Sequence, residues 1–147
     1  MDEISIPAQT GCLDILMDFI FAVMRNARAE QSRWGNVAVA AEEIFVNIAS
    51  YAYASDKGDV IIRAGVEAGQ IVLEFRDSGK PFNPLNVKDP DISLAAEDRA
   101  IGGLGIYIVK KLMDEVRYEY RDGQNALIVS KKITGPVTGV KDCCHED

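Results

Sequence analysis

The chain has 147 residues, of which 48% are hydrophobic and 27% charged, a composition that suits one compact domain and excludes a disordered protein. Its 16 basic and 23 acidic side chains give a net charge of −7. This charge argues against direct nucleic-acid binding or an anionic membrane surface, because long-range repulsion opposes both, but it leaves open a nucleotide bound by backbone amides and a metal.

The first half of the chain predicts one strand and two helices. The N-terminus lacks the basic and apolar regions of a signal peptide, and no apolar run approaches the roughly 20 residues of a membrane span. Ile4-Ser5-Ile6 alternates as a short strand, followed by a turn over Pro7 to Gly11. Apolar residues at steps of three and four predict an amphipathic helix from Leu13 to about Ala29, and Gly35-Asn36 interrupts the helical pattern. A second helix, expected from about Val37 to Ala54, is apolar on most of its circumference and should be buried on more than one side.

The second half predicts two hairpins separated by a long loop and a third helix. The first hairpin follows a turn at Asp56-Lys57-Gly58, with strands over Val60–Ala64 and Ile71–Phe75 and a loop at Glu67-Ala68-Gly69. Asp77 to Ile101 is a long loop with three of the five prolines, a length typical of lids and binding loops. A helix is expected from Gly103 to about Met113, and then a hairpin of Val116–Tyr120 and Ala126–Ser130 around Asp122-Gly123.

This order of elements predicts an α+β fold: a two-layer sandwich in which helices cover one face of a mixed, mostly antiparallel sheet. Residues 1–133 are expected to form the domain, and 134–147 a flexible C-terminal tail. Cys143, Cys144 and His145 could form a metal clip, but a solvated tail is favoured because a closed metal site needs about four ligands. With Cys12 the chain has an odd number of cysteines, which favours a reducing, cytoplasmic compartment over a disulfide framework.

Three motifs stand out. Glu43 and Asn47 lie four residues apart in the second predicted helix, so their side chains share one face, whereas Glu42 points away. A buried amide there needs a partner, which either a structural hydrogen bond or a metal ion would supply.

The second motif, Asp77-Ser78-Gly79-Lys80-Pro81-Phe82, follows a predicted strand. A carboxylate at a strand end can accept a hydrogen bond from an exocyclic amine, and Gly79 lets a flat ligand approach the backbone. Asp-Ser-Gly is also a common turn.

The third motif, Ile101-Gly102-Gly103-Leu104-Gly105-Ile106-Tyr107, places glycines at the start of an apolar helix, where exposed amides and the helix dipole attract anions. It is neither a P-loop nor the dinucleotide fingerprint, because the Lys-Ser/Thr pair and the third glycine of the fingerprint are absent. Ordinary helix capping is the alternative.

In this order and on these elements, the three motifs resemble those of the GHKL-type (Bergerat) ATP-binding fold over about Ile4 to Lys132. The closer similarity is to bacterial anti-sigma-factor serine/threonine kinases, which act in partner-switching regulation of transcription. The resemblance implies ATP and Mg²⁺ as cofactors. Its expected partners are a sigma factor and an anti-sigma-factor antagonist (STAS-type) domain, and it also favours a homodimer.

The resemblance also implies a role for each matching residue. Asn47 would coordinate Mg²⁺, and Glu43 would act as general base or orient the attacking hydroxyl. Asp77 would bind the adenine amine, with Gly79 giving the base room. Segment 80–102 would be the ATP lid, in which Arg99 resembles an arginine that reaches the terminal phosphate; a solvated lid residue is the alternative. Amides around Gly102, Gly103, Leu104 and Gly105 would bind the phosphates.

The sequence departs from the family pattern in two regions. Ala126 and Leu127 occupy the region where the superfamily often has a last-strand threonine that supports the adenine. Tyr51 stands one turn past Asn47, where related kinases often have histidine.

Two functions fit these residues. The first is a serine/threonine kinase that phosphorylates the antagonist and sequesters a sigma factor; the second is an ATP-dependent switch that sequesters a partner without phosphoryl transfer. Glu43 favours the kinase. The catalytic domain of a histidine kinase fits poorly, because the only histidine is His145 and no dimerisation helices precede the domain.

Overall fold

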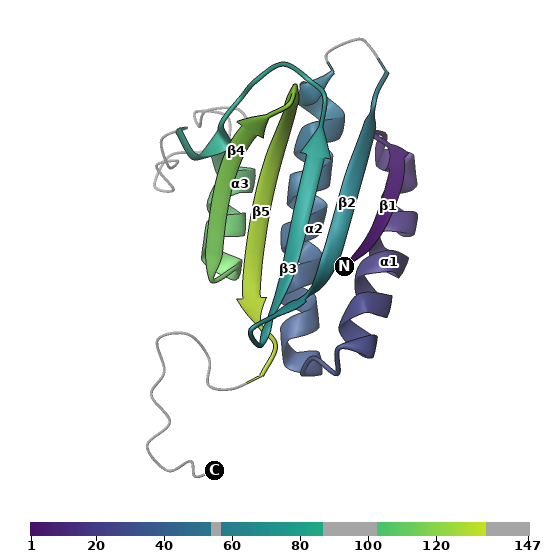
Figure 1. Ribbon diagram of the computed structural model, residues 1–147, viewed down its shortest axis with the longest axis vertical. Helices are drawn as coiled ribbons and strands as arrows, with labels where there is room; N and C mark the ends of the chain where they lie inside the picture. The colour runs from purple at the N-terminus through teal and green to yellow at the C-terminus, as the bar shows by residue number, and fades with distance from the viewer. Residues whose placement is uncertain (54–56, 87–102, 135–147) are drawn as a thin grey trace.

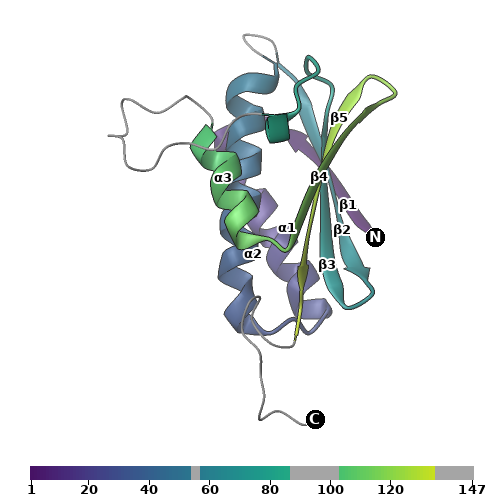
Figure 2. The ribbon, with the colours of Figure 1, turned by 90° about the vertical axis from the view of Figure 1, so that its left-hand side faces the viewer.

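The structure, a computed structural model, describes residues 1–53, 57–86 and 103–134. It is a two-layer sandwich in which one face of a five-stranded antiparallel sheet is covered by helices (Figures 1 and 2). The strands lie in the order β1-β2-β3-β5-β4. Their bounds are β1 Asp2–Pro7, β2 Asp59–Glu67, β3 Gln70–Asp77, β4 Glu115–Arg121 and β5 Gln124–Lys132. The helices are α1 Leu13–Asn26, α2 Trp34–Asn47 and α3 Gly103–Leu112. The predicted α+β sandwich is confirmed.

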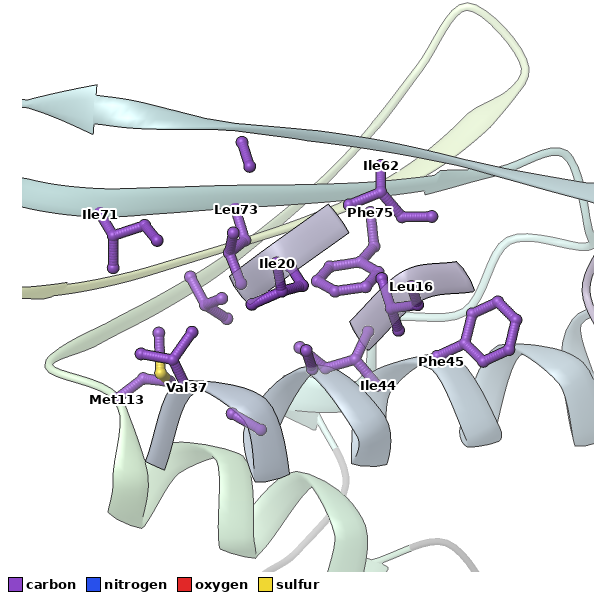
Figure 3. Close-up of a cluster of buried hydrophobic side chains, with 14 of the residues drawn as sticks. Leu16, Ile20, Val37, Ile44, Phe45, Ile62, Ile71, Leu73, Phe75 and Met113 are labelled. Carbon is purple, nitrogen blue, oxygen red and sulfur yellow. The ribbon is translucent and has the colours of Figure 1, made fainter. Parts of the chain in front are cut away.

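The core lies between the sheet and the helices. Strand side chains alternate between the two faces, so one apolar row of each strand faces the helices. Leu16 and Ile20 of α1 and Ile44 of α2 meet Ile62 and Phe75 of the sheet in this layer (Figure 3). Helix α2 packs against both α1 and α3, which explains why its sequence is apolar on most sides.

Both hairpins close through two-residue loops with positive backbone φ angles. These angles are 52° at Ala68 and 76° at Gly69, and 56° at Asp122 and 79° at Gly123. Such angles match the right-handed twist of the flanking strands, and Gly adopts them without strain. The first loop is shorter than predicted, because Glu67 still pairs with Gln70 in the ladder.

The break between α1 and α2 lies earlier than the sequence indicates. The predicted interruption at Gly35-Asn36 is wrong, because both residues lie inside α2, and α1 ends at Asn26 instead of near Ala29. The chain turns at Arg28, whose φ is 57°. Trp34 is the first residue of α2, and its Nε1 donates a hydrogen bond to the Ala29 carbonyl at 3.0 Å, which fixes the start of the helix. Tertiary anchoring thus outweighs the weak helix propensity of Gly and Asn.

The second helix also changes character along its length. It is α-helical to Asn47 and continues as a single π-helical stretch, η3, over Ile48–Ala52. Such stretches often occur at functional sites, because they re-aim side chains at a helix end. Here the transition falls directly after the asparagine of the first motif.

Among the described helices, none is long and apolar enough to cross a membrane. Nor do the described residues contain a group of three or more His, Cys, Asp or Glu side chains that could hold a metal ion. Cys143, Cys144 and His145 lie outside the described residues, as does the predicted tail from 135 onward.

Candidate nucleotide-binding site

A cleft of about 390 Å³ opens between α2, α3 and one end of the sheet. Its walls are mostly apolar, and a few polar side chains converge on it, the usual composition of a small-molecule site. The apolar walls come from Ile44, Ile48, Phe75, Ile106, Val109 and Leu127, and the polar groups include Asn47, Tyr51, Asp77, Lys80, Tyr118 and Asn125. Asn47 and Asp77, which the sequence singled out, therefore line one cavity.

Asp77 is the last residue of β3 and is only 6% exposed. Its Oδ1 accepts two hydrogen bonds, from the Gly79 amide at 2.9 Å and from Asn125 Nδ2 at 3.0 Å. Within the described residues no donor meets Oδ2. Burial raises the pKa of Asp77 above its usual value, and the two N–H donors partly oppose that rise. The carboxylate thus retains an oxygen that a ligand donor can satisfy.

Asn125 is a cleft residue that the sequence analysis did not single out. It is 7% exposed and lies directly opposite Asp77 in the β3–β5 ladder. Besides Asp77, its Nδ2 donates to the carbonyls of Lys80 at 3.0 Å and Gly79 at 3.3 Å. Its Oδ1 accepts from the Phe82 amide at 3.0 Å and from the Tyr118 hydroxyl. An asparagine just after a hairpin loop is too common a pattern for sequence to reveal this role.

Gly79 makes a close backbone contact. A Cβ at this position would lie 2.2 Å from the Ala52 carbonyl oxygen and 2.7 Å from its carbon. Only glycine therefore lets the turn after β3 pack against the end of η3. The structure therefore gives Gly79 a packing role, and its predicted role in giving a flat ligand room stays a prediction.

Tyr53 provides a second link between η3 and the turn after β3. Its hydroxyl accepts from the Ser78 amide at 2.8 Å and donates to the Asp59 carbonyl at 2.6 Å. Burial is the main cause that raises the pKa of this phenol. A Cβ at Gly58 would lie 2.2 Å from the Tyr53 ring, so this glycine lets the ring lie close to the chain. The end of η3 and the second motif are thus held together by packing and hydrogen bonds.

Glu43 and Asn47 converge on Gly105 in the first turn of α3. A Cβ at Gly105 would lie 3.0 Å from Asn47 Nδ2, 3.2 Å from Glu43 Oε1 and 3.5 Å from Asn47 Oδ1. Glu42, by contrast, is exposed. The glycine therefore leaves space for the two polar ends, beside a helix N-terminus whose first amides lack intrahelical acceptors.

The remaining predicted residues fall in two groups. Gly103 and Leu104 form the start of α3, next to Gly105. Arg99 and Gly102 lie outside the described residues.

The two departures from the family pattern have different structural outcomes. Leu127 lines the cleft as an apolar wall, and Ala126 lies on the opposite face of β5. The polar group that reaches Asp77 from this strand is Asn125. Tyr51 is 52% exposed and lines the cleft from η3.

Comparison with known proteins identifies the family of the chain. The model of the histidine kinase-like ATPase domain family matches residues 6–131. The serine-protein kinase RsbW of Bacillus thuringiensis (strain Al Hakam) is 26% identical over 130 residues, covering 86% of this chain and 81% of that protein. RsbW of Bacillus mycoides (strain KBAB4) is 25% identical with the same coverage.

A solved structure supports the same fold. The crystal structure of the RsbU and RsbW domains of Rv1364c from Mycobacterium tuberculosis matches with a TM-score of 0.66 at 16% identity. The match covers 96% of this chain and 34% of that chain, so the protein spans about a third of the solved one. The sequence resemblance to GHKL-type ATPases, and to anti-sigma-factor kinases among them, is confirmed. By its sequence match over most of its length, the chain belongs to the family of histidine kinase-like ATPase domains.

Proposed function

We propose that the protein binds Mg-ATP in this cleft and transfers its terminal phosphate to a serine or threonine of an anti-sigma-factor antagonist (STAS-type) domain. In the same proposal it sequesters a sigma factor, acts in the cytoplasm, and forms a homodimer. The observation that carries the proposal is the convergence of Glu43 and Asn47 on Gly105, beside an apolar cleft that contains Asp77. The RsbW serine-protein kinases, similar over most of the chain, support the choice of reaction.

The cleft offers a distinct environment for each part of the nucleotide. Asp77 Oδ2 would accept a hydrogen bond from the adenine amine, and the apolar walls would cover the ring. The amides at the start of α3, around Gly102 to Gly105, would bind the phosphates. Arg99, expected in the lid, would reach the terminal phosphate.

The residues present fit Mg²⁺. This ion prefers oxygen ligands and keeps waters, so one side-chain amide with phosphate oxygens can hold it without a cluster of protein carboxylates. Asn47 Oδ1 and Glu43 Oε1 both lie close to Gly105 in the first turn of α3, which supports Asn47 as the residue that would coordinate the ion. When bound, Mg²⁺ neutralises phosphate charge.

Glu43 would supply the proton chemistry. The acceptor hydroxyl oxygen forms a bond to the terminal phosphorus, the bond between that phosphorus and the ADP oxygen breaks, and Glu43 takes the hydroxyl proton or orients the hydroxyl. In phosphoryl transfer, the positions of the reacting groups matter more than covalent catalysis, because the transition state is loose and charged.

An ATP-dependent switch that sequesters its partner without phosphoryl transfer is the second candidate. Fold alone does not distinguish it from the kinase. Glu43 beside Asn47 favours the kinase, because a switch needs no base next to the phosphates.

Two measurements test the proposal. Mg-ATP at about 100 times its Kd should add roughly 2.7 kcal/mol to the free energy of unfolding. No stabilisation of nucleotide-free protein would refute ATP binding. Labelled ATP is then incubated with the protein and the antagonist domain encoded nearest to it. Label on a serine or threonine supports the kinase, and a stable unlabelled complex supports the switch.

Glu43→Gln tests the base. We expect it to keep ATP affinity and lose transfer, whereas Glu42→Gln, on the exposed side of α2, should keep both. Wild-type transfer by Glu43→Gln would refute the assigned role.

A further inference from the structure

The amide of Asn125 uses all of its hydrogen-bonding capacity inside the cleft wall. The two N–H groups of Nδ2 are shared among three acceptors, Asp77 Oδ1 and the carbonyls of Gly79 and Lys80, and Oδ1 accepts from Phe82 and Tyr118. One buried side chain thus ties β5 to Asp77 and to the turn that follows β3. A buried side chain whose polar atoms are all hydrogen-bonded is held in a single orientation.

The network also determines which way the amide points. The Phe82 amide and the Tyr118 hydroxyl are donors, so they require the oxygen of Asn125 on their side. The opposite orientation would place that oxygen 3.0 Å from the Asp77 carboxylate, where both atoms carry negative charge. Nδ2 therefore faces Asp77.

The hydrogen bonds leave the two oxygens of Asp77 in different situations. Asn125 and the Gly79 amide both meet Oδ1 and none of the described donors meets Oδ2, so the carboxylate is held with one oxygen available to a ligand. Ala126 and Leu127, the next two residues of β5, have no polar side-chain group. The register places the Asn125 amide opposite Asp77 instead.

We propose that Asn125 is a positioning residue that holds Asp77 for recognition of the 6-amino group of adenine, so that it sets nucleotide selectivity through Asp77. The inference rests on the proposed function, since it assumes that the purine lies against Asp77. Replacing a residue that merely stabilises the fold would lower the affinity for all nucleotides equally. Replacing a positioning residue lowers the affinity only for nucleotides that donate a hydrogen bond to Asp77.

The first experiment compares ATP with purine riboside triphosphate, which lacks the 6-amino group. Dissociation constants are measured by calorimetry with Mg²⁺ for the wild type and Asn125→Ala. The wild type should prefer ATP about tenfold, the factor expected for one buried hydrogen bond. Asn125→Ala should reduce this preference to about twofold or less.

Lys131→Met is the matched control. Lys131 is buried at the other end of β5, where its Nζ donates to the Leu112 carbonyl at 2.8 Å. Its loss should destabilise the fold and leave the ratio of the two dissociation constants at the wild-type value. An equal loss of affinity for both nucleotides in Asn125→Ala would overturn the proposal. If the wild type binds neither nucleotide, the proposed function itself fails, a result distinct from unchanged selectivity.

A second variant keeps the test informative if Asn125→Ala does not fold. Asn125→Asp has nearly the same shape but, when ionised, repels Asp77, and the two carboxyls can share one proton. Its ATP affinity should therefore rise as pH falls from 8 to 6. Wild-type affinity should not rise over this range, because protonation of Asp77 removes an acceptor. The same pH profile in both proteins would refute the positioning role.

Several other ionisable groups lie near Asp77. Tyr53 and Tyr118 face it, Asp59 lies beside Tyr53, and Lys80 lines the same cleft. Burial raises the pKa of both tyrosines, so they stay neutral between pH 6 and 8. An ATP affinity that rises with falling pH in Asn125→Asp but not in the wild type therefore reports on the carboxyl pair.

Discussion

Replacing Gly105 by alanine should separate stability from nucleotide binding. The new Cβ would lie 3.0 Å from Asn47 Nδ2, which is 0.4 Å inside the 3.4 Å at which ordinary contact begins. It would lie 0.2 Å inside that limit for Glu43 Oε1, at 3.2 Å. Both atoms are side-chain ends, so they can retreat by these amounts. Alanine also favours the helix by about 1 kcal/mol over glycine. We therefore expect the free energy of unfolding to stay within about 1 kcal/mol of the wild type.

The same small retreat should impair the site. Displacement of catalytic groups by 1 Å can reduce rates about a hundredfold, so shifts of a few tenths of an ångström should reduce phosphate transfer by roughly tenfold. Urea unfolding gives stability, calorimetry gives Mg-ATP affinity, and labelled ATP gives transfer. Gly35→Ala is the control, because it makes the same change inside a helix without a new contact. Gly35 lies in α2, and no heavy atom lies within 4 Å of a Cβ at this position. If Gly105→Ala binds Mg-ATP and transfers phosphate as well as Gly35→Ala, the contact with Glu43 and Asn47 has no functional role.

Three further predictions concern stability. Asp77→Asn can keep both hydrogen bonds on Oδ1, so it should be more stable than the wild type, by a margin that grows as pH rises from about 4 to 7. Burial raises the pKa of Asp77 in the folded state, so its stabilising contribution is present at low pH and is lost as pH rises through that pKa. Gly79→Ala should destabilise the fold by about 1–3 kcal/mol or more in urea unfolding, because its Cβ overlaps the Ala52 backbone. Lys131→Met should cost about 1–3 kcal/mol in the same assay, because the Leu112 carbonyl at the end of α3 loses its buried charged partner.

Each of these has a contradicting outcome. If the difference in unfolding free energy between wild type and Asp77→Asn narrows toward neutral pH, the pKa of Asp77 is not raised by folding. Wild-type stability of Gly79→Ala would mean that the Ala52 contact can relax freely. Lys131→Met without loss would mean that water replaces the lysine at that carbonyl.

Local patterns in the sequence were enough for most of the fold. Helical and strand periodicities placed the core faces of α1, α2 and the strands, and glycine with Asp or Ala marked both hairpin loops. These signals span a few residues, so they depend little on the rest of the chain. The helix start at Trp34 was missed because it depends on the Ala29 carbonyl and on packing, which outweigh the local preference of Gly35 and Asn36.

The sequence by itself determined that Glu43 and Asn47 share a helix face, because a spacing of four residues puts them on one side wherever that helix lies. Only the tertiary structure decided how the motifs meet. Asn125 contacts Asp77 across 48 positions because of the β3–β5 register, and a shift of one residue would turn it to the other face of the sheet. The close contacts at Gly79 and Gly105 likewise come from distant neighbours, Ala52 and the Glu43–Asn47 pair. Such contacts depend on how whole elements pack, and no short stretch of sequence records that packing.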